Sequence, residues 1–167
     1  IQVGWDGPAL KDDYVGVGLP DAQGAAQWDN FFYVADGNPN ALLMPTTPGD
    51  YAITYFLREG RKAIAETTIS LTAVVATIDA PAEAKAGSEI TVGWTGPGYE
   101  NDYIGIGLVG ATGANKWDNF FYAKNESPQI LTIPTDPGDY EISYFFGQDR
   151  AILETVAISV TDTEATI

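Results

Sequence analysis

The chain has 167 residues and a net charge of −15, from 8 basic and 23 acidic side chains. It has no cysteine and no histidine, which excludes disulfides, the usual zinc sites and catalysis by Ser-His or Cys-His pairs. Nucleic acid and anionic membrane surfaces are poor partners, because both are bound by clustered Lys and Arg. We therefore expect a non-catalytic protein without a cofactor.

The sequence repeats itself after 89 positions. Residues 1–78 align with residues 90–167 without a gap, and 38 of the 78 pairs are identical. Solenoid repeats are shorter, about 20–50 residues, so this period predicts one autonomous domain per copy. The expected domains are residues 1–76 and 77–167.

The two copies differ at their beginnings. The first copy has no counterpart of residues 79–89, and the chain ends where that segment would start again. Either the segment is dispensable or the chain is a piece of a longer tandem array, and we expect the second. No signal peptide or membrane-spanning segment is recognised in these residues.

Apolar alternation and turn residues predict strands throughout the second copy. The expected strands are 77–80 with 83–86 as an edge strand broken at Pro81, then 90–94, 102–108, 117–122, 129–133, 140–145 and 151–161. Alternation places Ile142 and Val92 among the inward residues, and no helix is expected. Seven short strands per period predict an all-β fold of two tandem immunoglobulin-like β-sandwich domains.

Strand 102–108 carries a glycine stripe. Tyr103, Gly105 and Gly107 share one face, and Tyr14, Gly16 and Gly18 repeat the pattern in the first copy. Glycine weakens a strand, so the stripe is expected to make room for a large ring or a second backbone. Either an aromatic residue of the same domain or a partner covers it.

The run WDNFFY occurs twice, at residues 28–33 and 117–122. In a strand, Trp117 and Phe121 would share one face, and Phe120 and Tyr122 the other. A sheet with one solvent-exposed face should not need aromatic residues on both of its faces. One of the two aromatic pairs is therefore either covered by other residues or binds a ligand. The candidate ligand-binding residues are Trp28, Asp29, Phe31, Tyr33, Trp117, Asp118, Phe120 and Tyr122, together with Tyr103, Gly105 and Gly107.

Several short motifs resemble a known family. They are W-x-G-P at 94–97, D-Y-I-G-I at 102–106, P-G-D-Y-E at 137–141 and R-x-I-L at 150–153. They resemble the immunoglobulin-like repeats that accompany von Willebrand factor A domains in bacterial envelope or secreted proteins. The first two motifs are also similar to the N-terminal domain of purple acid phosphatases and to the SKICH-type sandwich. Tyr140, with Tyr51 as its equivalent, resembles the tyrosine corner of immunoglobulin-like sandwiches.

This resemblance covers almost all of each copy and implies a non-catalytic accessory module outside the cytoplasm. It transfers no functional residue, because such modules share a scaffold and no common site. We therefore expect a spacer, adhesive or protein-binding region of a larger bacterial protein, whose partner is another protein or a neighbouring domain. The alternative is a carbohydrate-binding module that stacks a polysaccharide on the exposed rings of WDNFFY.

Acidic residues suggest a weaker hypothesis, calcium binding at one end of each sandwich. The candidate ligands are Asp12, Asp13, Asp29 and Asp50 in the first copy, and Asp102, Asp118 and Asp139 in the second. No EF-hand or RTX spacing is present, and aspartate at turns is ordinary local hydrogen bonding. We therefore predict no metal site.

Overall fold

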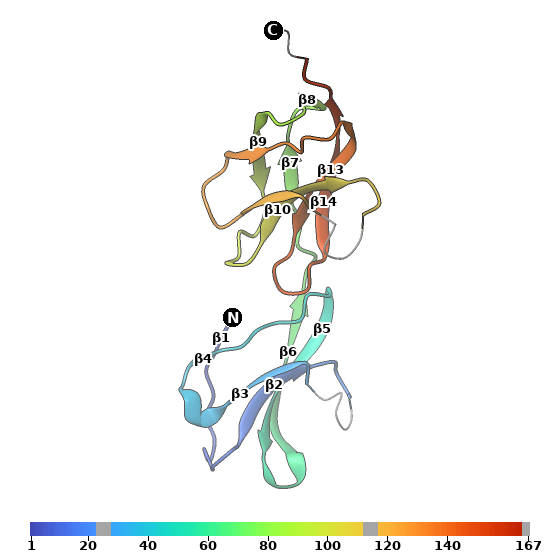
Figure 1. Ribbon diagram of the computed structural model, residues 1–167. Helices are drawn as coiled ribbons and strands as arrows, with labels where there is room; N and C mark the ends of the chain where they lie inside the picture. The colour runs from blue at the N-terminus through green and yellow to red at the C-terminus, as the bar shows by residue number, and fades with distance from the viewer. Residues whose placement is uncertain (23–27, 112–116, 165–167) are drawn as a thin grey trace. The chain divides into compact units, whose positions relative to one another are not determined.

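The computed structural model describes residues 1–22, 28–111 and 117–164. The described residues are all-β, which confirms the predicted fold class; the helical residues among them are two 3-10 turns, η2 (Val34–Asp36) and η3 (Glu59–Arg61). The chain divides into two compact units, Ile1–Ala73 and Val74–Ile167. Figure 1 shows the strands of each unit. Within the described ranges, we find no helix with the length and apolar character needed to cross a membrane.

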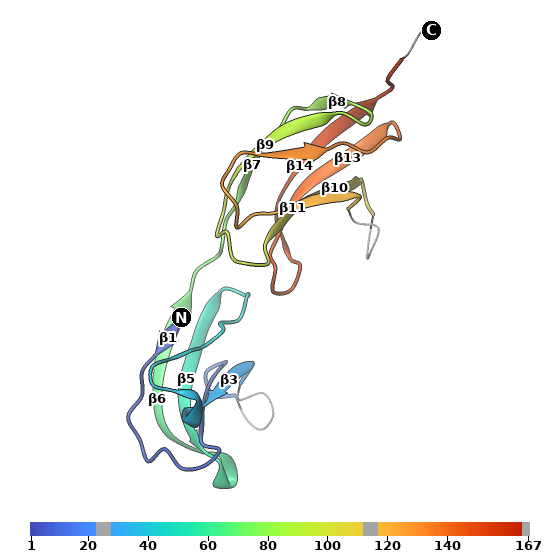
Figure 2. The same ribbon diagram turned by 60° about the vertical axis from the view of Figure 1, so that its left-hand side comes forward.

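The second unit is a β-sandwich of two sheets. One sheet has the strand order β12-β9-β7 and the other β11-β10-β13-β14-β8, and Figure 2 shows them from the side. The strands are β7 (Thr77–Asp79), β8 (Glu83–Lys85), β9 (Glu89–Thr95), β10 (Tyr103–Leu108), β11 (Asn119–Tyr122), β12 (Gln129–Thr132), β13 (Gly138–Phe145) and β14 (Ile152–Thr161). Its pairs are antiparallel except for β8, which runs parallel to β14.

The first unit has a smaller set of strands. They are β1 (Gln2–Val3), β2 (Tyr14–Gly18), β3 (Asn30–Tyr33), β4 (Asn40–Ala41), β5 (Gly49–Leu57) and β6 (Lys62–Leu71). The larger sheet has the order β3-β2-β5-β6, and β1 pairs with β4. The spacing of 89 matches β2 with β10, β3 with β11, β5 with β13 and β6 with β14.

Side-chain alternation decides the core, as the sequence predicts. The inward residues of β9, β10 and β13 are buried: Ile90, Val92, Ile104, Ile106, Tyr140, Ile142 and Tyr144. Leu108, which alternation puts on the same face of β10 as Ile104, is instead 52% exposed. It ends β10, and its carbonyl accepts a turn hydrogen bond from Ala111 N–H at 3.0 Å.

The predicted tyrosine corner is confirmed in both units. The hydroxyl of Tyr140 donates to the carbonyl of Asp136 at 2.9 Å, and that of Tyr51 donates to the carbonyl of Thr47 at 2.9 Å. Each bond ties the start of a long inner strand to the turn before it. These tyrosines therefore serve the scaffold and leave the sheet's outer face to other residues.

Candidate functional site

Each unit carries an aromatic cluster with one arginine on the outer face of its larger sheet. We call it the aromatic–arginine cluster. Its members in the first unit are Tyr14, Trp28, Phe31, Tyr33, Phe56 and Arg61, and in the second Tyr103, Trp117, Phe120, Tyr122, Phe145 and Arg150. The six residue types are the same in both units at the spacing of 89, whereas fewer than half of all aligned pairs are identical.

Strand register brings the cluster together. In the second unit, Tyr103 of β10 lies opposite Tyr122 on one side and Phe145 on the other. The rings of Tyr103 and Phe145 stack, with centroids 4.7 Å apart and planes at 11°. Facing aromatics on neighbouring strands stabilise the sheet, so these two rings form a fixed floor.

Tryptophan lies against the glycine stripe. A Cβ built on Gly105 would be 3.0 Å from the Cβ of Trp117, and one on Gly16 would be 3.0 Å from the Cβ of Trp28. Gly107 is also buried. At Gly105 and Gly16, an aromatic residue of the same unit therefore covers the stripe, which is one of the two alternatives that the sequence left open.

The face predicted for tryptophan is wrong. Alternation placed Trp117 with Phe121, but its ring lies on the outer face, 5.2 Å from Tyr103 and 5.7 Å from Phe145. The reason is that β11 begins only at Asn119, so alternation does not extend back to residue 117. Phe121 does turn inward, where its ring lies 5.0 Å from Trp94.

Two rings of each cluster remain open to solvent. Phe31 and Tyr33 are 46% and 44% exposed, and Phe120 and Tyr122 are 48% and 45% exposed. Within each pair the rings meet edge to face, at 82° and 88°. They lie on β3 and β11, the outermost strands of their sheets. Each unit thus presents an apolar ridge along a sheet edge.

An arginine lies over each tryptophan. The guanidinium carbon of Arg61 is 5.2 Å from the ring centroid of Trp28, and that of Arg150 is 5.7 Å from the ring centroid of Trp117. Cation–π attraction holds such pairs together. The clusters therefore offer a positive charge in a chain that is otherwise strongly acidic.

The backbone positions these arginines in the same way in both units. Arg61 and Arg150 have φ angles of 52° and 62°, in the left-handed region that non-glycine residues rarely adopt. Both hairpins also shift register next to the cluster, between Tyr55 and Phe56 and between Tyr144 and Phe145. Such irregularities re-aim side chains and gather near functional sites.

The floor of each cluster holds an unsatisfied polar atom. The hydroxyls of Tyr14 and Tyr103 are buried and have no hydrogen-bond partner among the described residues. Burial raises the pKa of both phenols, and the nearby Arg61 or Arg150 partly offsets the rise. A buried hydroxyl without a partner costs free energy. Each cluster therefore has one buried polar atom in its floor that no described residue satisfies.

The second cluster borders a shallow pocket. Its volume is about 230 Å³, and its lining consists of Asn101, Tyr103, Trp117, Phe120, Tyr122, Gly147 and Arg150. Five of these seven residues belong to the cluster. The exposed rings, the arginine and Tyr103 of the floor thus border one recess.

The buried aspartates serve the scaffold. Asp102 is fully buried and accepts hydrogen bonds from the Tyr144 hydroxyl at 2.9 Å, Tyr99 N–H at 3.0 Å and Gly147 N–H at 2.8 Å. This network ties the loop before β10 to the end of β13. This network was not predicted from the sequence, although Asp102 and Tyr144 both recur at the spacing of 89.

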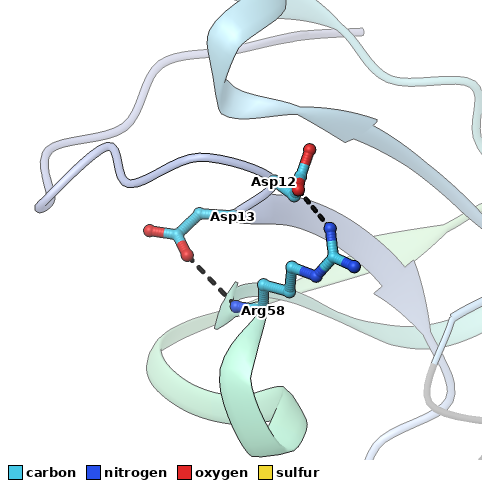
Figure 3. Close-up of polar contacts among 3 residues, drawn as sticks. All are labelled: Asp12, Asp13 and Arg58. Carbon is cyan, nitrogen blue, oxygen red and sulfur yellow. Dashed lines mark hydrogen bonds and ion pairs between the residues drawn. The ribbon is translucent and has the colours of Figure 1, made fainter.

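Asp13 repeats this network in the first unit. It accepts from the Tyr55 hydroxyl at 3.2 Å and from the backbone N–H groups of Leu10 and Arg58 at 3.0 and 3.1 Å. Figure 3 shows Asp13 against Arg58, whose guanidinium pairs with the neighbouring Asp12. Within the described ranges, no three acidic residues gather in a group that suits a metal ion.

The remaining predicted site residues lie around the cluster. Asp29 and Asp118 are exposed and precede their strands, where their backbone N–H groups donate to Val17 and Ile106. Two members of each cluster were not predicted from the sequence: the phenylalanine at 56 and 145 and the arginine at 61 and 150. The signal that could have found them is that both residue types are identical in the two copies. Neither the protein-family models nor the curated proteins compared with this sequence match it.

Proposed function

We propose that this chain is a non-catalytic module that binds a protein partner through its two aromatic–arginine clusters. The observation that carries the proposal is the repetition of one six-residue cluster with half-exposed rings above an unpartnered tyrosine hydroxyl. Tryptophan, tyrosine and arginine dominate the binding energy of protein interfaces. Two clusters on one chain would also allow bivalent attachment, which suits an adhesive role.

The ring geometry favours a protein over a polysaccharide. A sugar stacks on an open, flat ring face. Arg150 lies over the ring of Trp117, 5.7 Å from its centroid, and so occupies one face of the indole. The exposed Phe120 and Tyr122 meet at 88° and form a ridge instead of a platform. A ridge of this kind fits an apolar recess on a partner.

The charge of the chain bears on the kind of partner. A net charge of −15 repels acidic surfaces and accelerates association with basic ones. The partner that we propose has an apolar recess for the ridge of exposed rings. Basic residues around that recess would face the acidic remainder of the chain, outside the two cluster arginines. The proposed setting is outside the cytoplasm, as the resemblance to bacterial envelope repeats implies.

A display selection on the immobilised 167-residue chain tests this function. Peptide and protein-domain libraries are selected in parallel with a polysaccharide panel. The test variant carries Phe31→Ala and Phe120→Ala. The control carries Leu43→Ala and Ile130→Ala, which remove apolar side chains outside the clusters that are at least as exposed, at 58% and 55%.

Protein ligands that bind the wild type and the control, but not the test variant, support the proposal. Ligands that bind all three equally place recognition elsewhere and contradict it. Binding of polysaccharides alone, lost in the test variant, would assign the clusters to sugar recognition.

A further inference from the structure

One segment closes the sandwich of the second unit by pairing with both of its sheets. β7 pairs antiparallel with β9, where Ile78 lies opposite Trp94. β8 pairs parallel with β14, where Ala84 lies opposite Val160. Pro81 lies between β7 and β8, where the chain passes from one sheet to the other. Proline is tolerated there because it needs no ladder donor.

The same segment completes the core. Its inward residues are small and apolar and pack against the core of the second unit: Ala76, Ile78, Ala80, Ala84 and Ala86. Its intervening polar residues are exposed: Thr77, Asp79, Glu83 and Lys85. The pattern is therefore an alternating strand interrupted by one proline.

No described residue takes this place in the first unit. β6 pairs with β5 alone, and β1 pairs with β4 alone. Residues 70–72, at the end of β6, align with the β8 partners 159–161. Residues 4–6, after β1, align with the β7 partners 93–95. We call these two stretches the open edge of the first unit.

The core beneath the open edge is less buried than its counterpart. Val3, Ile69 and Leu71 are half-buried and pack against the core of the first unit. The matching residues of the second unit are almost fully buried: Val92 is 0% exposed, Ile158 2% and Val160 3%. Partly exposed apolar side chains and strand edges without a pairing strand thus lie at the same place in the first unit.

We propose that the open edge binds one extended polypeptide segment with the alternating pattern of residues 76–86, supplied from outside residues 1–167. In such strand addition, the added segment forms backbone hydrogen bonds with the edge strand, and its alternate side chains pack into the core. In the second unit, Ser159 N–H donates to the Ala82 carbonyl and Ala86 N–H donates to the Thr161 carbonyl, both at 2.9 Å. The corresponding groups of the open edge are Ser70 N–H and the Thr72 carbonyl.

A synthetic peptide of residues 75–88, added to the isotopically labelled 167-residue chain, tests the proposal. We expect saturable 1:1 binding, with amide NMR shifts at residues 4–6 and 69–72 and slowed exchange of the Ser70 amide. The second unit is an internal control, because its own segment already fills the equivalent place. The control peptide carries Ile78→Asp and Ala84→Asp, which puts charges at inward positions.

Two variants of the chain separate backbone pairing from side-chain effects. Ser70→Pro removes the donor at the open edge, and proline is tolerated on an edge strand. Ser70→Ala keeps that donor and removes only the side-chain bond to Asp50. We expect Ser70→Pro to weaken peptide binding about tenfold, the effect of losing one backbone hydrogen bond, and Ser70→Ala to leave it near the wild-type value.

Disulfide trapping checks the register even if Ser70→Pro disturbs folding. The chain has no cysteine, so a single introduced thiol reports one position. In the second unit Thr161 lies opposite Lys85. Thr72→Cys should therefore crosslink with a Lys85→Cys peptide and not with a Glu83→Cys peptide, whose thiol is two residues out of register.

Three outcomes would overturn the proposal. The first is an unchanged spectrum at saturating peptide. The second is shifts confined to the second unit, which would mean exchange with its own β7 and β8. The third is a dimer of the chain alone, found by light scattering, in which a second copy donates β7 and β8 to the open edge. All three leave binding at the aromatic–arginine clusters unaffected, so the two proposals are tested separately.

Discussion

Tyr144 donates its hydroxyl hydrogen bond to the fully buried carboxylate of Asp102 at 2.9 Å, across 42 positions of sequence. The same hydroxyl accepts a hydrogen bond from Gly98 N–H at 3.0 Å. One oxygen atom thus joins the loop before β10 to β13. This bond fixes the end of the sandwich that borders the aromatic–arginine cluster.

Tyr144→Phe should destabilise the second unit by about 1–3 kcal/mol, because Gly98 N–H and one carboxylate oxygen of Asp102 each lose a partner. Urea unfolding followed by tryptophan fluorescence measures the change. Tyr99→Phe, at a tyrosine that is 58% exposed, is the matched control and should change little. Equal stability of the two variants would contradict a structural role for this hydroxyl.

Alkaline pH should destabilise the protein through its buried phenols. Burial raises the pKa above the ordinary value of 10.0 for Tyr14, Tyr55, Tyr103, Tyr140 and Tyr144. Above about pH 10 the unfolded chain loses phenolic protons that the folded chain keeps, so stability is full below this pH and falls as pH rises.

Urea midpoints measured between about pH 8 and 11 check this prediction, because phenol linkage appears as a decline that begins near pH 10. Tyr144→Phe removes one of the raised groups, so its midpoint should decline less steeply. A wild-type midpoint that does not change across this range would contradict the prediction.

Gly105→Ala should cost about 1–3 kcal/mol, because its new methyl group would overpack the site. The Cβ would be 3.0 Å from the Cβ of Trp117 and 3.4 Å from the carbonyl of Asn119. Gly93→Ala is the control on a strand of the same unit, where the nearest atom is the Cβ of Asp79 at 3.6 Å. It should be neutral or stabilise by about 0.4–1 kcal/mol. Calorimetry that ranks the two variants in the opposite order would contradict the close packing of Trp117.

Phe120→Ala should cost only about 1 kcal/mol, since it removes edge contacts of a half-exposed ring with Tyr103 and Tyr122. Phe145→Ala removes a ring that is 1% exposed and should cost about 3–5 kcal/mol. Chemical unfolding of both variants checks the difference. A large loss at Phe120 would make it part of the scaffold and unsuitable for the binding test.

The strands and the core could be read from local patterns. Alternation around Ile142 and Val92 depends on the two-residue period of a strand, and the turn before Tyr140 carries its own Pro, Gly and Asp signals. The strands expected for the second copy therefore match those of the structure to within two residues at every end. At residues 117 and 118 the pattern continued beyond the strand, and the prediction for Trp117 was wrong for that reason.

The sequence by itself determined the repeat, because aligning the chain with itself is enough to show it. It also determined the all-β sandwich, because alternation and turn residues are properties of neighbouring positions, and the resemblance of Tyr140 to a tyrosine corner indicated that bond. Only the tertiary structure decided which face Trp117 takes, that Arg150 lies over it and that Asp102 is held by Tyr144. Contacts of this kind join residues about 30–45 positions apart through strand register and hairpin irregularities. No local pattern records them, because they arise when separate strands pair.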